Sequence, residues 1–271
     1  MTDTAAETRS PHFGREATAT TYRDIHLPRI FAPWARVLLE LVPVRPGEAV
    51  LDVATGPGTV AREAAVAAGP GGRVTGVDIS QAMLNIGRTW PPLPGGAPIE
   101  YLEASASALP VPDGAFDVAY CQQGLQHMAD PQAALREMRR ALKPGGRIGL
   151  AVWVKSPFGQ FRDIAAQVGL HSSGPQPSEF GRTADDLAAA LRELGFSEVQ
   201  VQTRELTAVL EGGIPQALEV AKATSLNVTL VDGDAEQAAA FEAAVRRALE
   251  PLVHADGVHL TSITNIASAH R

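Results

Sequence analysis

A glycine-rich turn and an acidic residue have the spacing of a nucleoside-binding site. A strand-like run from Ala49 to Ala54 leads into Gly56-Pro57-Gly58, and the next strand-like run ends at Asp78. Glycines let a ligand approach the backbone, and the helix that follows directs its free N–H groups into the same space. Asp78 lies 20 residues after Gly58, the spacing at which an acid accepts the hydroxyls of a ribose. The sequence therefore indicates a ligand that carries a nucleoside.

The charge of Asp52 bears on which nucleoside ligand this is. The run from Gly56 to Ala61 satisfies the dinucleotide pattern G-x-G-x-x-A, so a nicotinamide- or flavin-dependent oxidoreductase stays among the alternatives. Asp52 ends the first strand and would repel a diphosphate. It would attract an ammonium or a sulfonium group, by a few kcal/mol for a partly buried pair at ~4 Å. The sign of this charge favours S-adenosylmethionine.

Alternating strand and helix patterns position these residues. The strand-like runs are bounded by Gly, Pro and Asp turns, and helical patterns separate them. The predicted strands are Ala49–Ala54, Arg73–Asp78, Ile99–Leu102, Phe116–Cys121 and Arg147–Trp153. Strands that alternate with helices predict a parallel sheet covered on both faces. In such a sheet, ligands bind at the carboxyl ends of the strands.

The remaining segments are predicted to extend the sheet and to cover its ligand edge. We expect a helix from about Thr183 to Leu194, a strand from Ser197 to Leu210, a helical stretch over 214–252 and a final strand from Gly257 to Ala269. Near the start, an aromatic and amphipathic stretch from Phe13 to Leu41 is expected to form short helices, broken at Pro28 and Pro33. We therefore expect an N-terminal helical cap over residues 1–46 and one domain over 47–271, with helical insertions near 155–180 and 214–252.

Composition limits the class of protein. The 271 residues include 23 Lys and Arg against 30 Asp and Glu, a formal net charge of −7, and a single cysteine, Cys121. The acidic balance argues against nucleic acid as the main partner, and no apolar run reaches the roughly 20 residues of a membrane span. No Cys/His cluster has metal-ligand spacing, so no metal is expected. One cysteine and a start unlike a signal peptide favour the cytoplasm, and the oligomeric state is left open.

Four ordered motifs resemble those of a known family. They are V-L-D-V-A-T-G-P-G (50–58), V-T-G-V-D-I-S (74–80), L-P-V-P-D-G-A-F-D (109–117) and L-R-E-M-R-R-A-L-K-P-G-G (135–146). Together they resemble the class I S-adenosylmethionine-dependent methyltransferases, and most of all the small-molecule branch that includes ubiquinone/menaquinone-biosynthesis methyltransferases (methyltransferase type 11). The resemblance implies a Rossmann-like, doubly wound α/β fold with a mostly parallel seven-stranded sheet and helical cap elements. It also implies S-adenosylmethionine as the cofactor.

The resemblance implies roles for the residues of the first two motifs. Thr55, Gly56 and Gly58 would pass under the methionine part of the cofactor. Asp52 would lie nearby and would also accept hydrogen bonds from the N–H groups of the glycine loop, since the two roles are compatible. Asp78 would hold the ribose hydroxyls.

Further cofactor contacts follow from the same resemblance. Ile79 and Met83 would flank the adenine. The family usually carries Gly-Asp-Ala where this sequence has Ala104-Ser105-Ala106, so Ser105 replaces the acid that accepts from the adenine amino group. Adenine recognition by side chains is then expected to be weaker, or a backbone group near Ser105 and Ala106 takes over this role. Gln122 and Gln123 fall where family members touch the methionine end of the cofactor.

Tyr22 and His127 are the candidates nearest the substrate. Tyr22 would close over the cofactor from the N-terminal cap, and an aromatic face tolerates a sulfonium. His127 lies just after the fourth strand, where a neutral imidazole can take a proton from a hydroxyl or amine during methyl transfer. The alternative is that His127 anchors its loop. His26 and His171 are further, unranked candidates, and we interpret Cys121 as a packed small hydrophobic residue.

These observations predict an enzyme that transfers a methyl group from S-adenosylmethionine to a small, largely apolar metabolite. The acceptor atom, oxygen, nitrogen or carbon, is left open. The methyl donor is already activated, so positioning supplies much of the rate, worth ~7–11 kcal/mol, and a general base is optional. The alternatives are an S-adenosylmethionine-binding enzyme that does not methylate, such as a cyclase, and the NAD(P)-dependent oxidoreductase.

Overall fold

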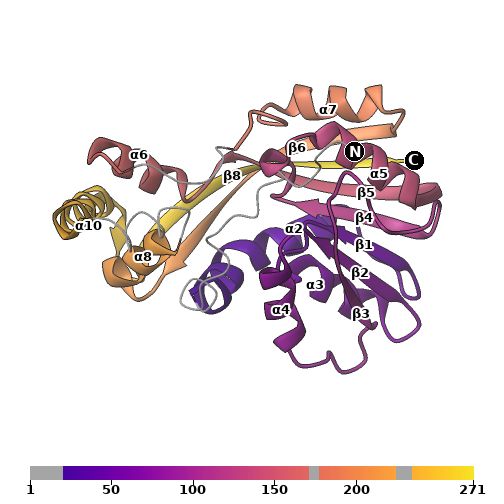
Figure 1. The fold of residues 1–271 in the computed structure, drawn as a ribbon, viewed down its shortest axis with the longest axis horizontal. Coiled ribbons are helices and arrows are strands. Elements are labelled where there is room, and N and C mark those ends of the chain that lie inside the picture. Colours follow the sequence, from indigo (N-terminus) through magenta and orange to yellow (C-terminus); the bar gives the residue numbers. More distant parts are fainter. Residues whose placement is uncertain (1–20, 171–176, 224–233) are drawn as a thin grey trace, which may run out of the picture.

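The computed structural model describes residues 21–170, 177–223 and 234–271 (Figure 1). Phe13, His171 and the first ten residues lie outside these ranges. Within them, no helix is both long and apolar enough to span a membrane.

A single mixed sheet forms the centre of the protein. Its strands are β1 (Ala49–Val53), β2 (Arg73–Asp78), β3 (Ile99–Glu103), β4 (Phe116–Gln122), β5 (Leu142–Lys155), β6 (Ser197–Leu210), β7 (Val253–His254) and β8 (Gly257–His270). The order is β3-β2-β1-β4-β5-β8-β6, and the two-residue β7 pairs with β8. The first five strands run parallel, whereas β8 is antiparallel to β5 and to β6. This arrangement confirms the predicted Rossmann-like fold and adds β7.

The order of the strands reverses at β1. The chain first builds outward through β2 to β3 and then returns to place β4 on the other side of β1. Asp52 is in register with Gly76 of β2 and with Tyr120 of β4, so the carboxyl ends of these three strands lie side by side. A crevice forms at such a reversal because the connections leave in opposite directions.

Helices cover both faces of the sheet. They are α2 (Ala32–Leu41), α3 (Thr59–Ala68), α4 (Gln81–Thr89), α5 (Pro131–Ala141) and α7 (Ala184–Glu193). α2 and α3 contribute Trp34 and Val60 to one core, while α5 and α7 contribute Met138 and Leu187 to the core on the opposite face. All five residues of β1 are buried, as expected for a strand covered on both sides.

A second group of helices forms a separate core, apart from the strands β1, β2 and β3. Its members are η2 (Tyr22–Phe31), α6 (Gly159–Gln167), α8 (Gly213–Lys222), α10 (Ala235–Leu249) and η4 (Glu250–Leu252). Figure 1 shows α6, α8 and α10 gathered at the end of the long β6–β8 ribbon. Phe161, Phe241 and Leu218 belong to a separate core there. The helical stretch predicted over 214–252 is thus α8 and α10, and residues 224–233 between them lie outside the described ranges.

Three local predictions need correction. Pro28 does not break the N-terminal helix, because it lies inside η2, whose backbone has the wider π-helical turn. Pro33 also causes no break, since it occupies the first turn of α2, where its missing N–H costs no hydrogen bond. β5 begins at Leu142 rather than at Arg147, because Leu142 already pairs with Phe116 before a register shift in the ladder.

Candidate functional site

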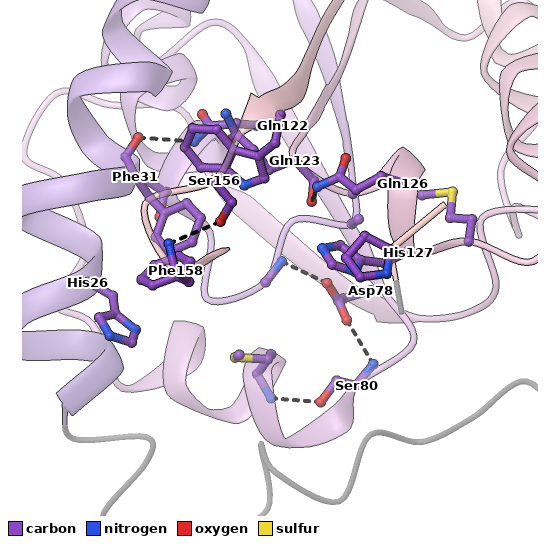
Figure 2. Close-up of a pocket in the computed structure, with 18 of the residues that line it drawn as sticks. His26, Phe31, Asp78, Ser80, Gln122, Gln123, Gln126, His127, Ser156 and Phe158 are labelled. Carbon is purple, nitrogen blue, oxygen red and sulfur yellow. Dashed lines mark hydrogen bonds between the residues drawn. The ribbon is translucent and has the colours of Figure 1, made fainter. Parts of the chain in front are cut away.

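A cavity of about 1540 Å³ opens at the carboxyl ends of the central strands (Figure 2). Its walls come from the turns after β1, β2, β4 and β5 and from the helices η2 and α6. The predicted site residues that line it are Tyr22, Asp52, Thr55, Gly56, Asp78, Ile79, Met83, Ser105, Ala106, Gln122, Gln123 and His127. Gly58 does not line it. In the described part of the chain, no group of three or more His, Cys, Asp or Glu residues is arranged to hold a metal.

Asp52 is fully enclosed at the base of this cavity. Its Oδ2 accepts hydrogen bonds from Thr55 Oγ1 at 2.5 Å and from the Ala61 backbone N–H at 3.0 Å. Burial raises the pKa of the carboxyl to about 7, against the effect of these two donors. Asp52 therefore fastens the glycine loop to α3 and keeps a carboxyl at the cavity wall.

The raised pKa of Asp52 predicts a specific pH dependence of stability. The folded protein holds a proton on this carboxyl up to about pH 7, whereas the unfolded chain releases it near pH 4. The contribution of Asp52 to the unfolding free energy therefore falls as pH rises, by about 2 kcal/mol between pH 5 and pH 7. Denaturant titrations at both pH values should show a smaller fall for Asp52→Asn than for the unchanged protein. Equal falls would contradict the assignment.

Asp78 connects the glycine loop to the start of α4. Its Oδ2 accepts from the Gly56 N–H and its Oδ1 accepts from the Ser80 N–H, both at 2.8 Å (Figure 2). Ser80 in turn caps α4, with its Oγ accepting from the Met83 N–H. Burial raises the pKa of Asp78 above its usual value, although three backbone N–H groups oppose this. The carboxyl group is held in one orientation at the edge of the cavity.

The two glycines of the turn have different surroundings. Gly56 has φ +55°, and a Cβ there would have no atom within 4 Å, because the position faces the cavity. Gly58 has φ +89°, and a Cβ there would overlap the Tyr101 hydroxyl and lie 2.9 Å from Tyr101 Cζ. Gly58 is thus packed against Tyr101, and its predicted cofactor contact stays a prediction.

The predicted adenine contacts lie on neighbouring turns. Met83 is buried in the first turn of α4, while Ile79 is 40% exposed. Ser105 Oγ shares a hydrogen bond with Ser107 Oγ at 2.7 Å and accepts from the Ser107 N–H. The hydroxyl of Ser105 therefore helps to shape its own turn, and Ala106 lines the cavity beside it.

Three glutamines lie at the end of β4 and just after it, and the sequence predicted two of them, Gln122 and Gln123, as site residues. Gln122 donates to the Phe31 carbonyl at 3.0 Å, and Gln126 donates to the Gln123 carbonyl at 2.8 Å. Among the described residues, both amide atoms of Gln123 and the amide oxygens of Gln122 and Gln126 have no hydrogen-bond partner. Gln123 also has φ +49°, a strained value for a residue with a side chain. The amides of Gln122 and Gln126 are each held by one backbone carbonyl, and Gln126 was missed because the sequence gives no indication of its direction.

Comparisons with known proteins identify the family. The family described as a methyltransferase domain matches residues 51–150. The ubiquinone/menaquinone biosynthesis C-methyltransferase UbiE of Hahella chejuensis is 34% identical over 162 residues, 52% of this chain and 65% of that enzyme. A demethylmenaquinone methyltransferase of Renibacterium salmoninarum is 31% identical over 197 residues, 67% of this chain and 77% of that enzyme. The chain belongs to the class I S-adenosylmethionine-dependent methyltransferases.

S-adenosylmethionine is the cofactor of this family, which disfavours the NAD(P) alternative. Other curated UbiE relatives are matched over only 45 to 47% of their length. Among solved structures, the [4+2]-cyclase SpnF is 25% identical with a TM-score of 0.55, over 88% of this chain and 80% of that one.

Aromatic rings form the wall of the cavity nearest the N-terminal helix. Tyr22 stacks on Phe31 with ring centroids 5.3 Å apart, and His26 lies between Tyr22 and Phe158 at 5.3 and 5.1 Å. Burial raises the pKa of Tyr22 and lowers that of His26 to about 4, so both rings are uncharged at neutral pH. Neither ring nitrogen of His26 has a hydrogen-bond partner of normal geometry among the described residues. His26, left unranked from sequence, and Phe158, not considered there, are both part of the site.

His127 ends the short helix η3 (Leu125–His127) and faces the cavity. Its side chain is accessible to solvent. Desolvation by the residues around the cavity, together with the charge of Arg162, lowers the pKa of His127 to about 4. A neutral imidazole at pH 7 can accept a proton. Figure 2 places His127 above Asp78, across the cavity from His26. Cys121, by contrast, is fully buried, and burial raises its pKa to about 12, as expected for a packed thiol.

Proposed function

We propose that this protein transfers a methyl group from S-adenosylmethionine to a small, largely apolar molecule. One observation carries the proposal: a single cavity joins the carboxyl-lined strand ends to the aromatic wall around His26 and Phe158. Its volume of about 1540 Å³ exceeds the ~300–1,000 Å³ of a pocket for one small molecule. The cavity therefore has room for the cofactor and an acceptor together.

We assign the cofactor to the strand-end half of the cavity. Asp78 would accept the ribose hydroxyls, and Ile79 and Met83 would flank the adenine beside Ser105 and Ala106. Thr55 and Gly56 would lie along the methionine part, with Gln122 and Gln123 at its far end and Tyr22 closing over it. A cationic ligand favours the ionised form of Asp52, so binding should release a proton near neutral pH.

The reaction proposed for this cavity depends mainly on position. When bound, S-adenosylmethionine supplies an activated methyl group, so the protein's task is to align an acceptor atom with it and to exclude water. The aromatic wall of Tyr22, Phe31 and Phe158 would hold an apolar acceptor. His127 would take the proton that an oxygen or nitrogen acceptor loses.

We also propose that residues 1–46 form a cap over the domain 47–271. The support is that the helix η2 supplies Tyr22 and His26 to the cavity. A cytoplasmic location and the absence of a nucleic-acid partner stay predictions from composition.

A reaction without methyl transfer is the second candidate. It is supported by the likeness to a solved structure named a [4+2]-cyclase. Both candidates require S-adenosylmethionine to bind, so the product distinguishes them.

Calorimetry with S-adenosylmethionine, S-adenosylhomocysteine and NAD tests the proposed function. We expect the first two ligands to bind and NAD not to bind. Incubation of the protein and S-adenosylmethionine with a library of apolar hydroxylated, amino and carbonyl compounds should then give a product heavier by one methylene. A product of unchanged mass supports the cyclase candidate, and binding of NAD alone overturns both.

Replacement of His127 by alanine should slow methyl transfer by about 100-fold, the lower end of the range for general bases. The affinity for S-adenosylhomocysteine should stay unchanged, because His127 would contact the acceptor and not the cofactor. Initial rates with the acceptor found in the screen, together with calorimetry, check both statements. Full activity of His127→Ala would leave His127 with the loop-anchoring role.

A further inference from the structure

Arg162 is a half-buried cation in the wall of the cavity. It lines the cavity from α6, which Figure 1 shows on the side of the fold away from α3 and α4. In the described ranges no hydrogen bond or ion pair joins it to another group, and the carboxylate whose charge acts on it is that of its exposed neighbour Asp163. The partly buried Arg140 and Arg147, in contrast, each contact a carboxylate at 2.7 Å. Partial burial without a carboxylate is costly for a guanidinium, which suggests that its partner is a ligand.

The charges of the cavity are divided between its two ends. The end built by β1, β2 and β3 carries Asp52, Asp78 and Glu103, and no basic residue lines it in the described part. The end built by β5 and α6 carries Lys155 and Arg162. An acidic end suits a cationic cofactor, and a basic end suits an anion.

The other charged groups at the basic end do not neutralise Arg162. Glu179 is paired with Arg182 at 2.5 Å. Asp130 accepts from the Ala133 N–H and from Arg136. Asp163 is exposed on the same helix, and Lys155 adds a second positive charge that is paired with no acid among the described residues. The histidines that line the cavity in the described part are His26, His127 and His259. His26 is uncharged at neutral pH, because burial lowers its pKa to about 4, and His259 contacts Asp256 at 2.8 Å. The net charge around Arg162 therefore remains positive.

Apolar side chains surround the basic end. Trp153, Pro157, Phe158, Ala223 and Leu252 line the same cavity. A ligand that fits both features has an apolar body and one anionic end.

We propose that the methyl acceptor is such a molecule, with a carboxylate or phosphate that pairs with Arg162 while its apolar body packs on Phe158 and its neighbours. This inference rests on the proposed function, because the acceptor occupies the half of the cavity that the cofactor leaves free. A guanidinium presents two parallel N–H donors that match either anion. The anion fixes one end of the acceptor, and the reacting atom then lies toward His127 and the glutamines.

Pairing of an anion with Arg162 also changes the pKa of His127. The charge of Arg162 helps to hold the pKa of His127 low. An anion bound to Arg162 offsets that charge, so the pKa of His127 rises when the acceptor is bound. The base becomes stronger once the substrate is in place.

Binding of three naphthalene probes to the protein saturated with S-adenosylhomocysteine tests the inference. The probes are 2-naphthoate, 2-naphthyl phosphate and the neutral 2-naphthamide, measured by fluorescence or calorimetry. At least one anion should bind about tenfold or more tightly than the amide, as a charged hydrogen bond provides. The anion that binds tighter identifies carboxylate or phosphate as the preferred group. Arg162→Gln should abolish the preference, and Arg162→Lys should keep part of it.

Arg246→Gln is the matched control, since it removes the same charge from the exposed side of α10, outside the cavity. It should leave the preference unchanged. In addition, the NMR titration of His127 should shift to higher pH when the preferred anion is added to the unchanged protein and not to Arg162→Gln. S-adenosylhomocysteine binding to each variant shows that it is folded.

Equal binding of anions and amide, no binding of either anion, or a preference that survives Arg162→Gln would overturn the inference. In each of these cases S-adenosylhomocysteine still binds and the proposed function stands. A protein that fails to bind S-adenosylhomocysteine would instead overturn the proposed function.

Discussion

Replacement of Asp78 by alanine is expected to lower the affinity for S-adenosylmethionine about 1000-fold, from the loss of two charged hydrogen bonds worth ~1.5–3 kcal/mol each. The carboxyl group is held by the N–H groups of Gly56 and Ser80. It is therefore already oriented, and no conformational entropy of this side chain is lost when the ligand binds. Alanine removes the acceptor for the ribose hydroxyls. It also releases the glycine loop from the start of α4.

Calorimetry with S-adenosylhomocysteine and S-adenosylmethionine measures this effect. Asp78→Asn keeps the size of the side chain and one acceptor oxygen, so it should retain part of the affinity. Asp185→Ala is the control, because Asp185 is an exposed acid on α7 and does not line the cavity. Unaltered affinity in a folded Asp78→Ala protein would refute the ribose assignment.

Replacement of Gly58 by alanine is expected to destabilise the protein by about 4 kcal/mol, from a strained backbone and an overpacked contact together. The backbone there has φ +89°, and the added Cβ would overlap Tyr101. Tyr101 cannot move aside freely, because its ring packs closely on the backbone of two more glycines, Gly76 and Gly87. An ideal Cβ at either position would lie about 3 Å from the ring. The strand β3 would have to shift with it.

Two other glycines separate the causes of this effect. Gly145→Ala introduces the same kind of positive φ, +74°, with no atom within 4 Å of the new Cβ, so it should cost only about 1 kcal/mol. Gly56→Ala has equally free surroundings, but its Cβ points into the cavity. It should weaken cofactor binding with a small loss of stability. Denaturant unfolding and calorimetry on all three variants check the order, and equal stability losses at Gly58 and Gly145 would contradict the Tyr101 contact.

Most of the fold could be predicted from the sequence because its signals are local. β2 has the predicted ends, since Arg73–Asp78 is a short apolar run between a glycine turn and a helix cap. β6 also has the predicted ends, Ser197–Leu210. The prediction failed at Pro28 and Leu142, where the backbone of a neighbouring segment decides the outcome. A π-helical turn accommodates Pro28, and pairing with Phe116 extends β5 back to Leu142.

The strand-end half of the cavity could also be predicted largely from the sequence. Asp52, Gly56 and Asp78 belong to short motifs in which a strand end, a turn and a helix start follow each other directly. In such motifs the spacing along the chain sets the spacing in space. These three residues line the cavity as their motifs indicate.

Only the tertiary structure decided which way the remaining side chains point. Gly56 and Gly58 are two residues apart with similar φ, yet one faces the cavity and the other faces Tyr101 of a different strand. His26 lies on η2, which precedes β1, and Arg162 lies on α6, which follows β5. Both line one cavity because η2 and α6 contribute apolar residues to the same core. Sequence spacing specifies contacts within a motif. Contacts between distant segments depend on how their apolar faces pack, and that packing formed the half of the cavity to which we assign the acceptor.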